Sequence, residues 1–308
     1  MTTNKGANRT FLITVILYIL LSVFGSIVSS FFGFSFYVDL FLAQLTVFLP
    51  SFFYIKIAGM KVGELIPYRK IRLSDALLTV VMTYLFYPLL VVMNLLTMFF
   101  VDNTTAQMTT VMQEQSMLWN VLFIAVLPAC VEEFVFRGLL FQTYKKSSLW
   151  KGVVLSAFLF GCMHMNFNQF LYTFVFGMIL AMAVEATGSI WTSMICHFVL
   201  NLNSVLLMAV TDNVQGGSLN EAAAQSSAIV DDPQMLLMGT VFWIVIAVFT
   251  TAGAVAIWVH LAKKNGRLEN FRTDWKGQAK EKLFSIPLLI GILLAVIVMV
   301  MLELASRL

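Results

Sequence analysis

Charged side chains are scarce in this sequence, and their scarcity excludes a soluble protein. Asp, Glu, Lys and Arg supply 11% of the 308 residues, whereas soluble domains carry about 25%. Hydrophobic residues supply 60%, above the roughly 45–50% of a soluble domain. We therefore expect an all-α, polytopic transmembrane helical bundle with no room for a large soluble domain.

Other features are also missing. The chain has only three cysteines, all within apolar runs, which argues for helix-packing residues rather than disulfides or metal ligands. The first apolar run lacks a small-residue cleavage site, so we interpret it as a retained helix and not as a signal peptide. We find no internal repeat and no low-complexity tract.

Apolar runs long enough to cross a bilayer recur along the chain. A helix needs about 20 such residues to span the hydrocarbon core. The sequence predicts about eight to nine spans, of which 150–166 and 168–186 are separated by a very short connection. The candidates are 11–30, 36–57, 76–101, 117–143, 150–166, 168–186, 189–210, 235–261 and 283–304.

The distribution of Lys and Arg predicts the topology. With the N-terminus in the cytoplasm and strict alternation of the spans, 18 of the 19 basic residues fall on the cytoplasmic side, and Arg307 is the exception. The two long outer loops, 102–116 and 211–234, contain acidic residues and no Lys or Arg. The basic segment 58–75 is expected to be a cytoplasmic loop; a helix lying along the membrane interface is the alternative.

Three charges lie in six residues of the fourth span, Glu132-Glu133-Phe134-Val135-Phe136-Arg137. Each charge at bilayer depth costs about 3 kcal/mol on insertion scales, so such residues indicate a functional site. Glu133 precedes Arg137 by four positions, the favoured order for an ion pair on one helix face. Glu132 is rotated by about 100° and is expected to lack a partner, which suits a general base in an apolar environment.

Two later helices contribute polar residues at the same spacing. Phe160 precedes His164 by four residues, so its ring can pack against the imidazole and orient it. His197 precedes Asn201 by four residues, and the two polar groups share one helix face. Together they have the hydrogen-bond donors needed to stabilise an oxyanion.

These residues form three ordered motifs that resemble those of the CAAX prenyl protease and bacteriocin-processing family (CPBP, Abi-like). The motifs are Glu132-Glu133-x-x-x-Arg137, Phe160-x-x-x-His164 and His197-x-x-x-Asn201. The stretch between them is also similar to the family, with Gly177 and then Glu185-Ala186-Thr187-Gly188-Ser189-Ile190. The resemblance covers about 115–205.

The resemblance implies an intramembrane endopeptidase. It assigns activation of water to Glu132 and His164, and oxyanion stabilisation to His197 and Asn201. Glu133, Arg137 and Phe160 would be supporting residues. The resemblance implies a metal-free glutamate mechanism with no cofactor; the alternative is Zn²⁺ bound by Glu132, His164 and His197, although the chain contains no HExxH motif.

On this interpretation the chain has three parts. Residues 1–110 hold the N-terminal helices and the cytoplasmic basic loop, 111–210 the catalytic core, and 211–308 an extracellular loop and the C-terminal helices. We expect a multi-pass plasma-membrane protein, bacterial by analogy, whose partners are the lipid bilayer, a peptide or membrane-protein substrate and a membrane-protein partner, without nucleic acid. The expected role is peptide maturation, bacteriocin immunity or signalling.

Other interpretations remain open. A non-proteolytic membrane scaffold or chaperone would regulate a partner membrane enzyme without using Glu132 chemically. A transporter would use Glu132 and the histidines as a proton relay, but it predicts an inverted repeat that the sequence does not show. A structural ion pair explains Glu133 and Arg137 but not Glu132.

Overall fold

All of the regular secondary structure in the described residues is helical. The computed structural model describes residues 2–33, 35–101, 116–214, 232–273 and 281–307, and no strand occurs among them. The expected all-α bundle is confirmed. The expected outer loops fall mostly on 102–115 and 215–231, which lie outside the described residues.

Eight of the described helices are long and apolar enough to cross a membrane. The ninth expected span, 150–166, corresponds to a helix of only 15 residues, α9, which is shorter than the roughly 20 residues that a bilayer requires. The bounds are α1 Asn4–Phe32, α2 Phe36–Ile57, α4 Leu73–Met98, a composite helix Met117–Tyr144, α9 Leu149–Met163, α10 Phe167–Thr187, α11 Ile190–Val214, α13 Pro233–Lys264 and α15 Ile286–Ser306.

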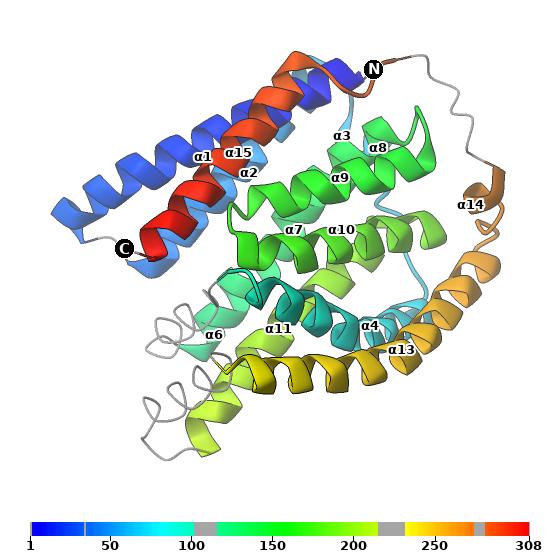
Figure 1. Ribbon diagram of the computed structural model, residues 1–308. Coiled ribbons are helices and arrows are strands. Elements are labelled where there is room, and N and C mark those ends of the chain that lie inside the picture. Colours follow the sequence, from blue (N-terminus) through cyan, green and yellow to red (C-terminus); the bar gives the residue numbers. More distant parts are fainter. Residues whose placement is uncertain (1, 34, 102–115, 215–231, 274–280, 308) are drawn as a thin grey trace.

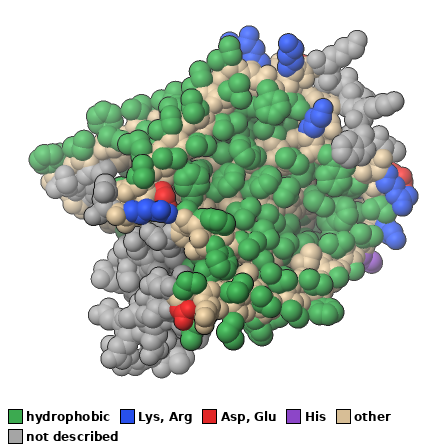
Figure 2. Space-filling model, viewed as in Figure 1, with side chains coloured by type: hydrophobic (Ala, Val, Ile, Leu, Met, Phe, Trp, Pro, Cys, Tyr) green, Lys and Arg blue, Asp and Glu red, His purple; other side chains and the backbone are tan. Residues whose placement is uncertain are grey.

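The helices form a central group between two outer groups. Helix α1 packs between α2 and α15 on one side, and α4 packs along α13 on the other (Figure 1). The composite helix, α9, α10 and α11 lie between these groups and contribute many of the fully buried side chains. Hydrophobic side chains cover most of the surface in Figure 2, as expected for a surface facing lipid, and Lys and Arg gather mainly at the end near the N-terminus and α14 (Asn270–Thr273).

The composite helix is not a regular α-helix. Its five parts are α6 Met117–Asn120, the π-helix η1 Val121–Val126, α7 Leu127–Glu133, the π-helix η2 Phe134–Leu140 and α8 Phe141–Tyr144. Pro128 lies just after η1 and has no backbone N–H, so the carbonyl of Ile124 loses its usual α-helical donor. π-Helical turns are often found at functional sites. The two that flank Glu132 and Glu133 therefore favour a functional role for this helix.

The segment after α2 folds back onto the composite helix. It contains the short helix α3, Val62–Leu65, followed by Ile66, which is fully buried. A Cβ on Gly138 would lie 2.7 Å from Cδ1 of Ile66, so glycine is needed for this close approach. Leu65 and Ile66 thus hold part of the basic segment 58–75 against the bundle, while most of its residues are at least partly exposed. Its placement as a cytoplasmic loop stays a prediction.

Candidate active site

Glu133 is the buried centre of the polar cluster. Its side chain has no exposed surface, and its Oε1 accepts a hydrogen bond from Nη1 of Arg137 at 2.9 Å. The predicted ion pair is therefore present. The same Oε1 lies 2.9 Å from Nδ1 of His197, a contact between α7 and α11 that the helix periodicity did not indicate.

This contact determines how His197 is oriented. With Nδ1 directed at Glu133, the other ring nitrogen, Nε2, lies 3.8 Å from Oε2 of Glu132. A carboxylate that accepts from one ring nitrogen fixes the tautomer and the ring plane. Glu133, His197 and Glu132 thus form a chain in which one imidazole is held between two carboxylates.

Glu132 has a partner, contrary to the expectation from sequence. Its Oε1 accepts a hydrogen bond from Nε2 of Gln44 on α2 at 2.9 Å. The Glu132 side chain keeps 16% of its surface exposed, whereas that of Glu133 has none. Gln44 is a neutral amide that lies outside the three motifs, so no pattern in the sequence marked it.

Arg137 is fully buried and held on three sides. Besides Glu133, it donates through Nη2 to the carbonyl of Gly177 on α10 at 3.3 Å. Its guanidinium lies 4.2 Å from the ring centre of Phe160, a cation–π distance. A Cβ on Gly177 would lie 3.0 Å from Cα and Cβ of Ala157 and 3.2 Å from Nη2 of Arg137, so the glycine lets α10 approach both.

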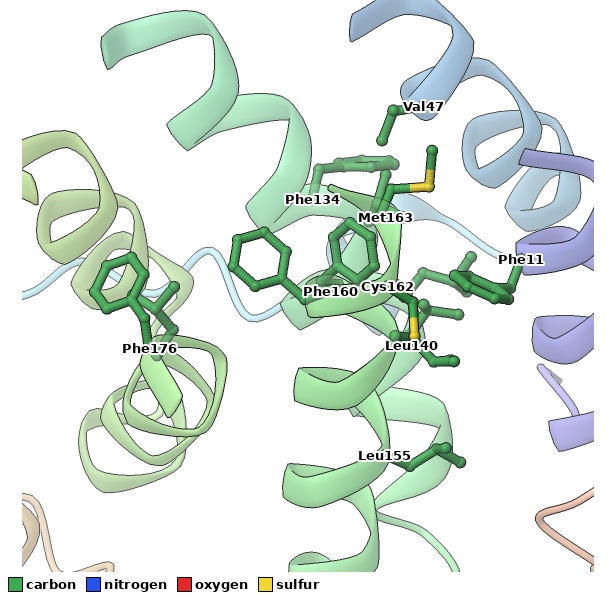
Figure 3. Packing of buried hydrophobic residues seen from close by; sticks show 14 of the residues in the cluster. Phe11, Val47, Phe134, Leu140, Leu155, Phe160, Cys162, Met163 and Phe176 are labelled. Atoms are coloured by element: carbon green, nitrogen blue, oxygen red, sulfur yellow. The ribbon is translucent and has the colours of Figure 1, made fainter. Parts of the chain in front are cut away.

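Phe160 connects the arginine to both histidines. Its ring meets that of His164 edge-on, with centres 4.9 Å apart, and that of His197 with centres 5.8 Å apart. Figure 3 shows Phe160 between Phe134 and Phe176 in the buried core. The predicted packing of this ring against the His164 imidazole is confirmed.

His164 ends α9 and is partly exposed. Its Nδ1 lies 2.9 Å from the carbonyl oxygen of Phe160, which directs Nε2 away from its own helix. Met165, the next residue, has a φ of 48°, so the chain turns sharply after the histidine.

Asn201 supplies the hydrogen-bond donor that Pro128 cannot. Its Nδ2 donates to the carbonyl of Ile124 at 3.0 Å, the carbonyl that loses its α-helical donor to the proline. A primary amide has two N–H groups, so one remains after this bond is made. The bond ties α11 to η1 and holds Asn201 one turn from His197.

The described residues contain no group of three or more His, Cys, Asp or Glu side chains placed to hold a metal ion. Glu132, His164 and His197 are thus not grouped as metal ligands in the described residues. Nδ1 of each histidine has a protein partner, which leaves Nε2 as the nitrogen that a metal could use. The metal-free mechanism stays a prediction.

Two cavities flank the cluster. One, of about 510 Å³, lies between α1 and α2 and is lined by Tyr18 and Ala43 among mainly apolar residues. The other, of about 450 Å³, is lined by residues 63–69 and by Gln142, whose Nε2 donates to the carbonyl of Arg137. Neither cavity is lined by Glu132, His164, His197 or Asn201.

Glu185, which lies in the stretch between the second and third motifs, joins three segments. Its buried carboxylate pairs with Lys145 at 3.0 Å and with Arg267 at 2.5 Å, and it accepts from Nδ2 of Asn270 at 2.6 Å. Gly188 ends α10 with a φ of 70° and lies against Arg267. This cluster joins the end of α10 to the segments that follow α8 and α13, and it supports the fold rather than the chemistry.

Comparison with protein families is consistent with this geometry. Residues 114–203 match the family model described as Rce1-like, type II CAAX prenyl endopeptidase, which confirms the resemblance seen in the motifs. The match covers every motif residue singled out above and points to a membrane-embedded peptide hydrolase of the CAAX protease type. Searches among curated proteins and among solved structures returned no match.

Proposed function

We propose that this multi-pass membrane protein is an intramembrane endopeptidase, starting from the Rce1-like match over residues 114–203. The observation that supports it best is the chain Glu133–His197–Glu132, in which a buried carboxylate orients an imidazole toward a second carboxylate. Hydrolysis of a peptide bond needs an activated water molecule and a stabilised oxyanion. The cluster contains candidates for both.

Glu132 and His164 are proposed to activate the water. Glu132 is the carboxylate of the pair that keeps some exposed surface, and no Lys or Arg of the described residues is hydrogen-bonded to it, whereas Arg137 is hydrogen-bonded to Glu133. In this proposal Glu132 takes the proton from water as the oxygen attacks the carbonyl carbon. It can then deliver that proton to the leaving amine.

His197 and Asn201 are proposed to stabilise the oxyanion. Nδ1 of His197 faces Glu133, so Nε2 donates a hydrogen bond only when the ring is protonated. In that form the ring would donate from Nδ1 to Glu133 and from Nε2 to the oxyanion. The second N–H of Asn201 provides the other donor.

The substrate class follows from the location of the cluster. Because the site lies on membrane-spanning helices, it suits a peptide or the end of a membrane protein that reaches into the bilayer. We propose peptide maturation, bacteriocin immunity or signalling-peptide processing in a bacterial plasma membrane as its role. Choosing among these requires the substrate.

The test compares peptide termini in membranes and medium of strains that carry the wild type, a deletion, Glu132→Ala or Cys130→Ala. The last is a matched control, because Cys130 is an exposed neighbour on the same helix. We expect Glu132→Ala to lose the same cleavage products as the deletion, while Cys130→Ala keeps them. If Glu132→Ala behaves as the wild type while the deletion has a phenotype, the protein acts without cleavage, as a scaffold or chaperone.

A further inference from the structure

Gln44 of α2 is the one amide that hydrogen-bonds Glu132 in the described part of the chain. It comes from outside residues 114–203, so the family match assigns it no role. The orientation of its amide follows from chemistry: a carboxylate only accepts hydrogen bonds, so the NH₂ group of Gln44 must face Glu132 and its oxygen must face elsewhere.

That oxygen has an unusual environment. Gln44 Oε1 is buried and has no hydrogen-bond partner among the described residues. A buried acceptor left unpaired costs free energy, and native proteins rarely keep one without a reason. Gln44 therefore keeps its bond to Glu132 although this leaves its own oxygen unpaired.

We propose that Gln44 is a positioning residue for Glu132. Its Nε2 donates to Oε1 of Glu132, while Oε2 of the same carboxylate lies 3.8 Å from Nε2 of His197. The bond from Gln44 thus fixes the rotation of the carboxylate that is proposed to take the proton from water. Gln44 orients this base without exchanging protons itself. This inference rests on the proposed peptidase function.

The neighbourhood of Gln44 is suited to this role. Ala43, the preceding residue, lines the α1–α2 cavity together with Tyr18. Helix α2 thus borders Glu132 on one side and this cavity on the other. A catalytic core built only from residues 114–203 would leave this side of Glu132 without a hydrogen-bond donor.

The test uses Gln44→Met, which has a similar length but neither donor nor acceptor. Leu49→Met is the control, on the same helix at a lipid-facing position that is 38% exposed. The substrate in this assay is a synthetic peptide. Its sequence spans the bond that is cleaved in the strain carrying the wild type but not in the strain carrying Glu132→Ala. We expect Gln44→Met to lower kcat about 10- to 100-fold, with KM within about 2-fold of the wild type.

A double-mutant cycle separates positioning from a merely structural effect. Glu132→Asp keeps the carboxylate but withdraws it from Gln44, so in that background Gln44→Met should change kcat less than about 3-fold. An unchanged kcat in Gln44→Met, or an equal loss in both backgrounds, overturns the inference. If Glu132→Ala loses cleavage products and Gln44→Met keeps them at the wild-type rate, only this inference fails. If Glu132→Ala keeps them as well, the peptidase proposal fails with it.

Discussion

Glu133 and His197 are 64 residues apart in the chain, yet Nδ1 of the histidine lies 2.9 Å from Oε1 of the glutamate. This contact fixes which nitrogen of His197 faces Glu132. It gives Glu133 two functions at once, since the same oxygen pairs with Arg137. The ion pair and the orientation of the histidine are therefore not independent.

Arg137→Met should destabilise the protein strongly. The arginine and Glu133 are both fully buried, and removing one member of a buried pair leaves the other charge uncompensated, at a cost of about 3–5 kcal/mol. The free energy of unfolding in detergent micelles measures this loss. Adding Glu133→Gln to Arg137→Met should recover part of it, because no buried charge is then left unpaired. A double variant less stable than Arg137→Met would contradict this account.

Gly177→Ala should cost about 1–3 kcal/mol through overpacking. The new methyl group would lie 3.0 Å from Ala157 and 3.2 Å from Arg137, so α10 must move away from the arginine. We also expect lower cleavage activity. The matched control is Gly239→Ala on α13, where a Cβ meets nothing within 4 Å and stability should stay unchanged or rise. Equal thermal shifts for the two variants would rule out the steric explanation.

Asn201→Leu should affect both activity and stability. It removes a proposed oxyanion donor, which typically lowers kcat about 100- to 1,000-fold, and it leaves the carbonyl of Ile124 without its donor. Pro128→Ala supplies a backbone N–H for that carbonyl. In the Pro128→Ala background we therefore expect Asn201→Leu to cost about 1 kcal/mol less stability, while its effect on kcat remains. Thermal unfolding and peptide cleavage of the four variants measure the two effects separately.

Glu185→Ala should destabilise the protein without altering its chemistry. The carboxylate is buried and hydrogen-bonded by two cations and an amide, so its loss should cost about 2–3 kcal/mol. Glu64→Ala removes an exposed pair with Lys61 at 3.8 Å and should leave the unfolding temperature unchanged. At the temperature of the assay, Glu185→Ala should give less folded protein than the wild type and Glu64→Ala the same amount. The KM of both variants should equal that of the wild type. A large change in the KM of Glu185→Ala would instead indicate a role in substrate binding.

Metal removal should leave cleavage intact. The described residues place no three His, Cys, Asp or Glu side chains around one point, and Glu132 is proposed to act on water directly. Treatment of purified protein with a zinc chelator, followed by peptide cleavage, checks this. Loss of activity on chelation and its recovery with Zn²⁺ would favour the alternative in which Glu132, His164 and His197 bind the ion.

The local sequence patterns were sufficient for part of the site. The i, i+4 spacing predicted the pair between Glu133 and Arg137 and the packing of Phe160 on His164, because a single helix fixes both. Hydropathy predicted the helical bundle, since the bilayer allows few other ways to satisfy the backbone. Residues 150–166 were predicted to span the membrane, but the helix found there, α9, has only 15 residues. Apolar composition alone does not distinguish a buried helix from a membrane-crossing one.

Contacts between helices were beyond the reach of sequence patterns. The pairing of Gln44 with Glu132, of His197 with Glu133 and of Asn201 with Ile124 depends on which helix faces meet. A charge in an apolar run is costly to bury, and it therefore indicates a functional site. For this reason the sequence by itself determined the membrane bundle, the ordered motifs and the residues of interest. Only the tertiary structure decided their partners, because periodicity defines the face of a helix but not the neighbour against which that face packs.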